Sequence, residues 1–213
     1  MKIPLEKRLK KKVHIELALL QDEVMDILFS LYSGPELVLH GGTALWRCYN
    51  GNRFSEDLDF YGSFHDDFEK RLSAELERRG LVLLKFKKAP YVIYAKITNN
   101  QTEVKLEISK NMPPGRILRE YEKTDGSYIN IYTLSPENLI REKIDAYLTR
   151  KYIRDIYDVL HLSTFIEGDV PGMADFLEKL PAPIDEDNLR TLIYAGASPS
   201  FKEIVMALKR RFR

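Results

Sequence analysis

Apolar side chains near the start of the chain predict a helix, a strand and a second helix in direct succession. Residues 13–32 carry apolar side chains at helical spacing, and Ser33-Gly34-Pro35 after them stops the helix. The short apolar run 36–40 predicts a buried strand, and two glycines then open a helix over 41–49. The predicted fold therefore makes a tight glycine turn between a strand and a helix.

Alternating apolar and polar positions predict further strands. The run 57–61 alternates with period two, and an amphipathic helix over 66–79 follows it. Asn99-Asn100 is typical of a turn between two antiparallel strands. The later strands are predicted at 81–87, 90–98, 102–109 and about 128–132, the first three as an antiparallel meander.

Helical spacing replaces this alternation after residue 133. Helices are predicted at about 136–149, 153–166, 185–194 and 199–212. The pattern predicts an α/β (α+β) fold, in which a mixed-sheet α/β lobe over residues 1–133 is followed by a helical lobe over residues 134–213.

Composition narrows the class of protein. With 213 residues, 44% of them hydrophobic, the chain buries a substantial core, which excludes a disordered or fibrous protein. The formal net charge of +1 provides no global attraction for nucleic acid, so such a partner requires local patches. The basic ends, 1–12 and 202–213, are either solvated helix faces or RNA contacts. A single cysteine, Cys48, and no apolar run of membrane-spanning length favour a cytoplasmic protein without membrane contact.

Two carboxylates share one face of the predicted strand 57–61. Asp57 and Asp59 alternate with Leu58 and Phe60, so the apolar pair is buried and the acids lie side by side. Because like charges repel, a divalent metal between them would relieve the repulsion, as in phosphoryl-transfer sites. The Asp-x-Asp pattern alone also occurs on solvated strands.

The glycine turn is a second candidate element of the same site. Backbone amides at Gly41, Gly42 and Thr43 face outward at the start of a helix, where a phosphate approaches closely. The alternative is that Gly41 and Gly42 only make a tight turn and bind no phosphate. Taken together, an anion-binding turn and a carboxylate pair favour a nucleoside triphosphate site.

These segments resemble a known family. Gly41-Gly42-Thr43-Ala44-Leu45, followed by Arg53-x-Ser55-x-Asp57-x-Asp59-Phe60, is similar to the first motif of the AbiEii/AbiGii nucleotidyltransferase toxins, in the polymerase-beta-like superfamily. The resemblance implies catalytic, metal-binding roles for Asp57 and Asp59 in a two-metal Mg²⁺ site, with Mn²⁺ as an alternative. It also implies nucleotide binding by the residues Gly41, Gly42, Thr43, Arg53 and Ser55.

A third acid is predicted on the strand 103–109. Glu107 shares the polar face of this strand with Lys105 and Ser109, and the segment resembles the family's Lys-Leu-Asp/Glu-Ile segment. The resemblance implies that Glu107 binds a metal or helps to deprotonate the acceptor hydroxyl. A solvent-facing strand explains the pattern equally, and many relatives have the shorter Asp at this position.

Lys143 projects from the apolar stripe of the helix predicted over 136–149. A buried ammonium requires an anion, unless the amine extends past the edge of the core to solvent. Glu142-Lys143-Ile144-x-Ala146 resembles the family motif whose lysine is implicated in catalysis and triphosphate contact. Arg150, seven residues on, leans the same way and is predicted to support it.

The segment 154–158 supplies the last motif. Arg154-Asp155-x-x-Asp158 resembles the family's Arg-Asp-x-x-Asp, although an ordinary ion pair of Arg154 with Asp158, four residues apart, explains part of the pattern. The resemblance implies that Asp155 is a required catalytic acid that orients Lys143 or a phosphate contact. It gives Asp158 and Arg154 supporting roles.

The predicted reaction transfers NMP from an NTP to an acceptor hydroxyl and releases pyrophosphate. By resemblance, the protein is the toxin of a type IV-like toxin–antitoxin system, its acceptor is RNA such as the 3′ end of tRNA, and its partner is a cognate antitoxin protein. The alternatives are a non-catalytic nucleotide- or RNA-binding module and a kinase-like phosphotransferase. The chain has no Gly-x-x-x-x-Gly-Lys-Ser/Thr loop and no His-Arg-Asp motif to favour the latter.

Overall fold

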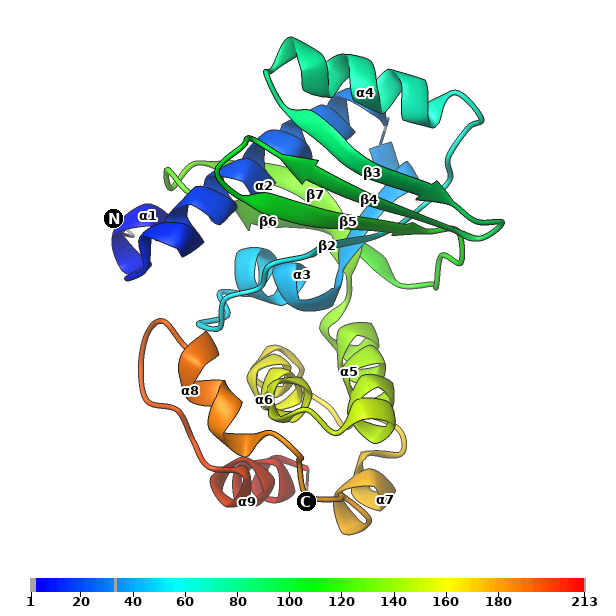
Figure 1. The fold of residues 1–213 in the computed structure, drawn as a ribbon. Coiled ribbons are helices and arrows are strands. Elements are labelled where there is room, and N and C mark those ends of the chain that lie inside the picture. The colour runs from blue at the N-terminus through cyan, green and yellow to red at the C-terminus, as the bar shows by residue number, and fades with distance from the viewer. Residues whose placement is uncertain (1–2, 33, 213) are drawn as a thin grey trace.

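The computed structural model of the protein describes residues 3–32 and 34–212 (Figure 1). Three parts of the sequence predictions lie outside this description: Ser33, the first residue of the predicted Ser33-Gly34-Pro35 helix stop, and the outermost residues of the two basic ends, 1–2 and 213. None of the helices in the described ranges combines the length and apolar composition that a membrane span requires.

A mixed sheet forms the first part of the fold, as the α/β prediction requires. Its order is β3-β4-β5-β2-β1-β7-β6. The pairs β2/β5 and β1/β7 are parallel, and the other neighbours are antiparallel. The strands are β1 (Leu37–His40), β2 (Leu58–Gly62), β3 (Val82–Lys88), β4 (Val92–Thr98), β5 (Glu103–Ser109), β6 (Arg116–Glu122) and β7 (Tyr128–Leu134).

The helices divide into two groups along the chain. The first group is α1 (Leu5–Arg8), α2 (Lys12–Leu31), α3 (Gly41–Cys48) and α4 (Phe68–Arg78). After the sheet come α5 (Pro136–Arg150), α6 (Ile153–Leu162), α7 (Met173–Glu178), α8 (Leu189–Leu192) and α9 (Phe201–Arg211), which lie together below the sheet in Figure 1. Ser135 caps α5 and Pro136 occupies its first turn, so this helix begins directly after β7.

Strand burial follows from position in the sheet. Leu37, Val38 and Leu39 are fully buried because β1 lies in the interior of the sheet, between β2 and β7. On β4 and β5, buried apolar residues alternate with exposed or half-exposed polar ones. Helices α2 and α4 contact β5 and β3, and thereby cover one face of this meander.

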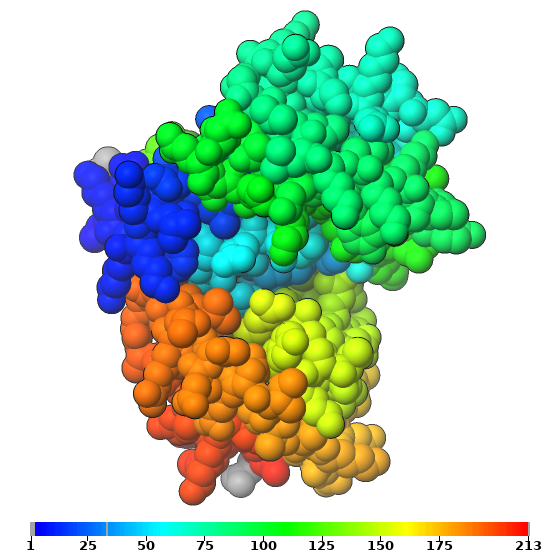
Figure 2. All heavy atoms as spheres, in the orientation of Figure 1, coloured from blue at the N-terminus to red at the C-terminus, as the bar shows by residue number. Residues whose placement is uncertain are grey.

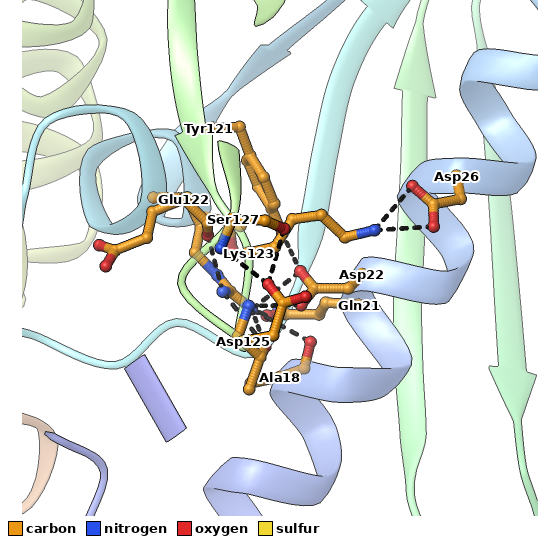
Figure 3. A network of polar contacts seen from close by, with 12 residues as sticks. Ala18, Gln21, Asp22, Asp26, Tyr121, Glu122, Lys123, Asp125 and Ser127 are labelled. Carbon is orange, nitrogen blue, oxygen red and sulfur yellow. Dashed lines mark hydrogen bonds and ion pairs between the residues drawn. The ribbon is translucent and has the colours of Figure 1, made fainter. Parts of the chain in front are cut away.

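A buried cluster of polar residues, the Arg47 network, connects α2 and α3 with the end of β6 and the β6–β7 turn. It comprises Asp22, Arg47, Tyr121 and Thr124. Arg47 Nη1 donates to Glu122 O at 2.9 Å, and its Nη2 lies 3.4 Å from Asp22 Oδ1. The same aspartate accepts from the Tyr121 hydroxyl at 3.1 Å and from the Thr124 amide at 2.7 Å. Figure 3 shows these aspartate contacts from α2 to the neighbouring strand ends.

Several elements differ from the sequence prediction. Strand β6 was not predicted, because Arg116, Arg119, Glu120 and Glu122 give it no apolar run; pairing with β7 along its whole length forms it. The short helices α1 and α7 were also missed. The helix predicted over 153–166 gives way to a 3₁₀ turn after Leu162, and only 189–192 of the predicted 185–194 is α-helical.

Candidate active site

The glycine turn at residues 41–43 is in direct contact with the segment that carries Asp57 and Asp59. Gly41 has a φ of 71°, and a Cβ there would overlap the Asp59 carboxylate, so this position requires glycine. A Cβ at Gly42 would lie 2.5 Å from Ser55 Oγ. The hydroxyl of Thr43 donates to the backbone oxygen of Asp57 at 2.5 Å. The start of α3 therefore lies directly against the two aspartates.

Three carboxylates line one wall of the site. Asp57 immediately precedes β2, and Asp59 lies within it, in register with Glu107 of the parallel strand β5. Burial raises the pKa of Asp59, and repulsion from Asp57 adds to the rise, while His40 opposes it. Burial also raises the pKa of Glu107, with repulsion from Asp59 as the next cause. These carboxylates therefore interact unfavourably with one another as they stand.

Cations held by buried acids form the opposite wall. Lys143 of α5 leaves only 8% of its side chain exposed, and its Nζ lies 2.8 Å from Asp158 Oδ2 and 3.8 Å from Asp155 Oδ1. Arg53 donates to both oxygens of Asp158, at 2.8 and 2.7 Å. Burial opposes ionisation of Asp158, but the two cations lower its pKa to about 2. The lysine therefore meets an anion and does not extend to solvent.

The two acids of α6, Asp155 and Asp158, make their shortest contacts with different cations. Asp155 accepts a bidentate contact from Arg150, with both distances 2.7 Å, while Asp158 forms the short contact with Lys143. The alternative pairing of Arg154 with Asp158 does not occur, because Arg53 and Lys143 occupy that carboxylate. The Arg154 guanidinium lies over the Tyr152 ring instead, 5.5 Å from its centroid.

A cleft of about 520 Å³ separates the two walls. Most predicted site residues line it: Gly41, Gly42, Arg53, Ser55, Asp57, Asp59, Glu107, Lys143, Arg150 and Arg154. Thr43, Asp155 and Asp158 do not line it; they are buried behind it, where they hold the residues that do. The structure thus brings together segments more than a hundred residues apart in the chain.

Sequence reasoning missed one polar group in this cleft. His40 Nδ1 lies 3.2 Å from Glu142 Oε2, and the Tyr61 hydroxyl donates to Glu142 Oε1 at 2.7 Å. The His40 and Tyr61 rings stack at 3.9 Å between centroids. Period-two spacing from Asp59 to Tyr61 was the available signal, since it places both on one strand face.

The acidic wall is the candidate metal site. Within the described residues, no three His, Cys, Asp or Glu side chains are close enough together to hold a metal ion as they are placed. The donor chemistry nonetheless fits Mg²⁺, which takes a few carboxylates together with waters and substrate phosphates. Asp57, Asp59 and Glu107 supply carboxylates at one wall of the cleft.

Comparisons with known proteins identify the family of the chain. The family model described as nucleotidyl transferase AbiEii toxin, type IV toxin–antitoxin system, matches residues 26–196. No protein in the curated set matches the chain.

Two solved structures from Helicobacter pylori share the fold. JHP933 aligns with a TM-score of 0.61 and 23% sequence identity, over 92% of this chain and 90% of its own. A second structure, described as a candidate nucleotidyltransferase, aligns with a TM-score of 0.60 and 24% identity, over 92% of this chain and 93% of its own. At this level of identity, the likeness shows the common architecture alone.

Proposed function

Because the chain belongs to the nucleotidyl transferase AbiEii toxin family of type IV toxin–antitoxin systems, we propose that it transfers NMP from an NTP to an acceptor hydroxyl. The proposed acceptor is RNA, such as the 3′ end of tRNA, and the proposed cofactor is Mg²⁺. The proposed setting is the cytoplasm, where a cognate antitoxin protein would restrain the toxin.

One observation carries this proposal: acidic and basic walls face each other across a single cleft. Asp57, Asp59 and Glu107 line it from the sheet, while Lys143 and Arg150 line it from α5. A triphosphate with bound metal presents both signs of charge, so it matches such a cleft better than an uncharged substrate would. The paired acids behind the basic wall keep its cations oriented.

Each wall has a defined part in the proposed reaction. Lys143 and the amides at the start of α3 would balance the charge of the triphosphate. Asp57, Asp59 and Glu107 would hold magnesium, which when bound stabilises the attacking and leaving oxygens of the displacement. Arg53 and Asp155 would position Lys143 and Arg150 through the buried carboxylate contacts.

The proposed reaction breaks a phosphoanhydride bond of the NTP and forms a phosphate ester bond to the acceptor. The acceptor hydroxyl oxygen bonds to the α-phosphorus as the bond from that phosphorus to the bridging oxygen of the β-phosphate breaks. Pyrophosphate leaves with the electron pair of the broken bond. The hydroxyl proton passes to a carboxylate at the acidic wall, for which Glu107 is the candidate base.

Label transfer tests the proposed function. The purified protein is incubated with each α-labelled NTP, Mg²⁺ or Mn²⁺ and total tRNA, and the labelled product is identified. We expect label in RNA with the wild type and with Asp66→Asn, an exposed acid outside the cleft. Asp57→Asn and Asp59→Asn should lose it. Transfer of label from γ-labelled but not α-labelled ATP would indicate a kinase, and binding without transfer of either label would indicate a non-catalytic module.

A further inference from the structure

Three lysines form a row across the meander. In the register of β3, β4 and β5, Lys85 is paired with Lys96, and Lys96 with Lys105. The row continues toward the acidic wall, where Lys105 Nζ lies 3.8 Å from Asp57 Oδ1. Residues directly paired across neighbouring strands lie on the same face, so the three amines and the carboxylate share one surface.

A second row runs beside the first. Lys87 is paired with Tyr94, and Tyr94 with Glu107, which is in turn the register partner of Asp59. Tyr94 as a whole residue is 43% exposed, although tyrosine usually buries most of its ring. We call the residues Lys85, Lys87, Tyr94, Lys96 and Lys105 the lysine face.

The lysine face is open and hollowed. Figure 1 shows β3, β4 and β5 turned toward the viewer, and Figure 2 shows their green atoms at the surface in the same orientation. A cavity of about 490 Å³ is lined by the lysine face together with Asp57, Asp59 and Glu107. Those three carboxylates also line the cleft of the candidate active site, so the two hollows meet at the acidic wall.

Such an arrangement is unfavourable for the protein alone. Like charges directly opposite one another on a sheet destabilise it. Lys96 forms an ion pair with Glu103, and Lys105 contacts Asp57. Among the described residues, Lys85 and Lys87 form no ion pair. An anion with several charges along its length would offset this repulsion.

We propose that the lysine face binds the single-stranded end of the acceptor RNA and leads its terminal hydroxyl to the acidic wall; this rests on the proposed nucleotidyl transfer. Phosphates would contact the lysines, and a base near the terminus would stack on Tyr94. Lysines on neighbouring strands are about 4.8 Å apart at the backbone and those two residues apart along a strand about 6.7 Å, so their flexible side chains can follow a phosphate backbone. An acidic protein could form ion pairs with the lysines, but it has no nucleobase to stack on the exposed ring of Tyr94.

Oligonucleotide binding tests the lysine face without catalysis. A short single-stranded RNA with a 5′ fluorophore and a free 3′ hydroxyl is titrated with full-length protein, and anisotropy gives Kd at several salt concentrations. In Lys85→Glu/Lys87→Glu, we expect Kd to rise roughly tenfold or more and the salt dependence to flatten. Tyr94→Ala should raise Kd roughly tenfold by the loss of stacking. NTP binding, measured by calorimetry, should stay unchanged in both variants.

The matched control lies on a rival basic surface. Lys209→Glu/Arg210→Glu makes the same charge change at two exposed positions of α9, within the basic C-terminal end. We expect wild-type RNA binding from it. Equal weakening in both double variants, or none in the lysine-face variants, would overturn the proposal, as would binding of polyglutamate in preference to RNA.

The same variants separate this proposal from the proposed function. If the wild type labels RNA and the lysine-face variants bind and label it equally well, nucleotidyl transfer stands and the lysine face is wrong as the RNA site. If the wild type labels no acceptor but loses RNA binding in the lysine-face variants alone, the RNA surface stands and the proposed reaction fails. Circular dichroism of each variant ensures that lost binding reflects the surface and not the fold.

Discussion

Two groups of buried charges lie at opposite ends of α3, and of the two only the group at its first turn faces the cleft of the candidate active site. The Arg47 network sits at the last turn of this helix, where the arginine side chain is fully buried and Asp22 is nearly so. At the first turn, Gly41 and Gly42 face the cleft that Lys143 lines from the other side. Both groups neutralise charge within the fold, but they do so with different partners.

The partners show what each group does. The Arg47 guanidinium donates to the backbone oxygens of Ala18 and Glu122, so its charge joins segments of the chain. Lys143 and Arg53 instead share the carboxylate of Asp158, which leaves their cleft-facing sides available to a ligand. Backbone partners indicate a structural role, and a shared carboxylate behind a cleft indicates a site.

The largest difference between loss of activity and loss of stability should appear when a carboxylate of the acidic wall is removed. In Asp59→Asn, we expect nucleotide transfer to fall about a thousandfold, equivalent to about 4 kcal/mol, because a proposed metal ligand is lost. Unfolding by urea should show unchanged or slightly higher stability, since the substitution removes a carboxylate that Asp57 and Glu107 repel. A loss of stability equal to the loss of activity would place Asp59 with the structural group.

The Arg47 network should show the opposite result. Arg47→Met leaves Asp22 buried without its cation and removes the hydrogen bonds from the guanidinium to the backbone oxygens of Ala18 and Glu122, so the free energy of unfolding should fall by about 3 kcal/mol. Activity per folded molecule should stay near the wild-type value, because the network does not line the active-site cleft. Denaturation curves and label transfer, corrected for the folded fraction, measure both quantities.

Lys143→Met is the matched control for Arg47→Met. The same charge is removed, but Asp158 keeps its bidentate contact with Arg53, so the loss of stability should be smaller. Transfer should nevertheless fall about a hundredfold, because the proposed triphosphate contact is lost. Normal transfer in this variant would contradict the proposed role of Lys143.

The pH dependence of stability sharpens the same comparison. The pKa of Asp158 is lowered to about 2, so its carboxylate stabilises the fold above the unfolded-state pKa of about 3.9, and this contribution is lost as pH falls toward 2. It amounts to about 2 kcal/mol. Wild type should therefore exceed Asp158→Asn in stability at neutral pH, and the gap should shrink by this amount between about pH 5 and pH 2. A gap that does not change with pH would show that Asp158 is not held as an anion.

Local pattern was enough to predict much of the fold. The spacing of apolar residues predicted α2, the β1-turn-α3 unit, the meander β3–β5 and the helix α5, because each has a strong period and clear stop residues. Strand β6 could not be predicted, since its charged residues form a strand only through pairing with β7. The boundary between lobes at residues 133 and 134 stays a prediction; β7 extends to Leu134.

The candidate site was predictable where its residues lie in one segment. Asp57 and Asp59 share a strand end, and the glycine turn is a local feature. Partners from distant segments were not predictable: Arg53 meets Asp158 across 105 positions, and His40 meets Glu142 across 102. The row of Lys85, Lys96 and Lys105 was equally hidden, because only strand register brings these residues together.

The smallest effect should come from Arg154, a half-buried residue of the basic wall. Arg154 lines the cleft, but its guanidinium contacts the ring of Tyr152 and takes no part in the pairing of Asp155 or Asp158. In Arg154→Ala, we expect KM for NTP to rise about fivefold, equivalent to about 1 kcal/mol, with kcat little changed and stability within about 0.5 kcal/mol. Steady-state transfer at varied NTP concentration measures the two constants separately. A fall in kcat with unchanged KM would instead mean that Arg154 acts mainly in the transition state, which would extend the catalytic group beyond the cations held by buried carboxylates.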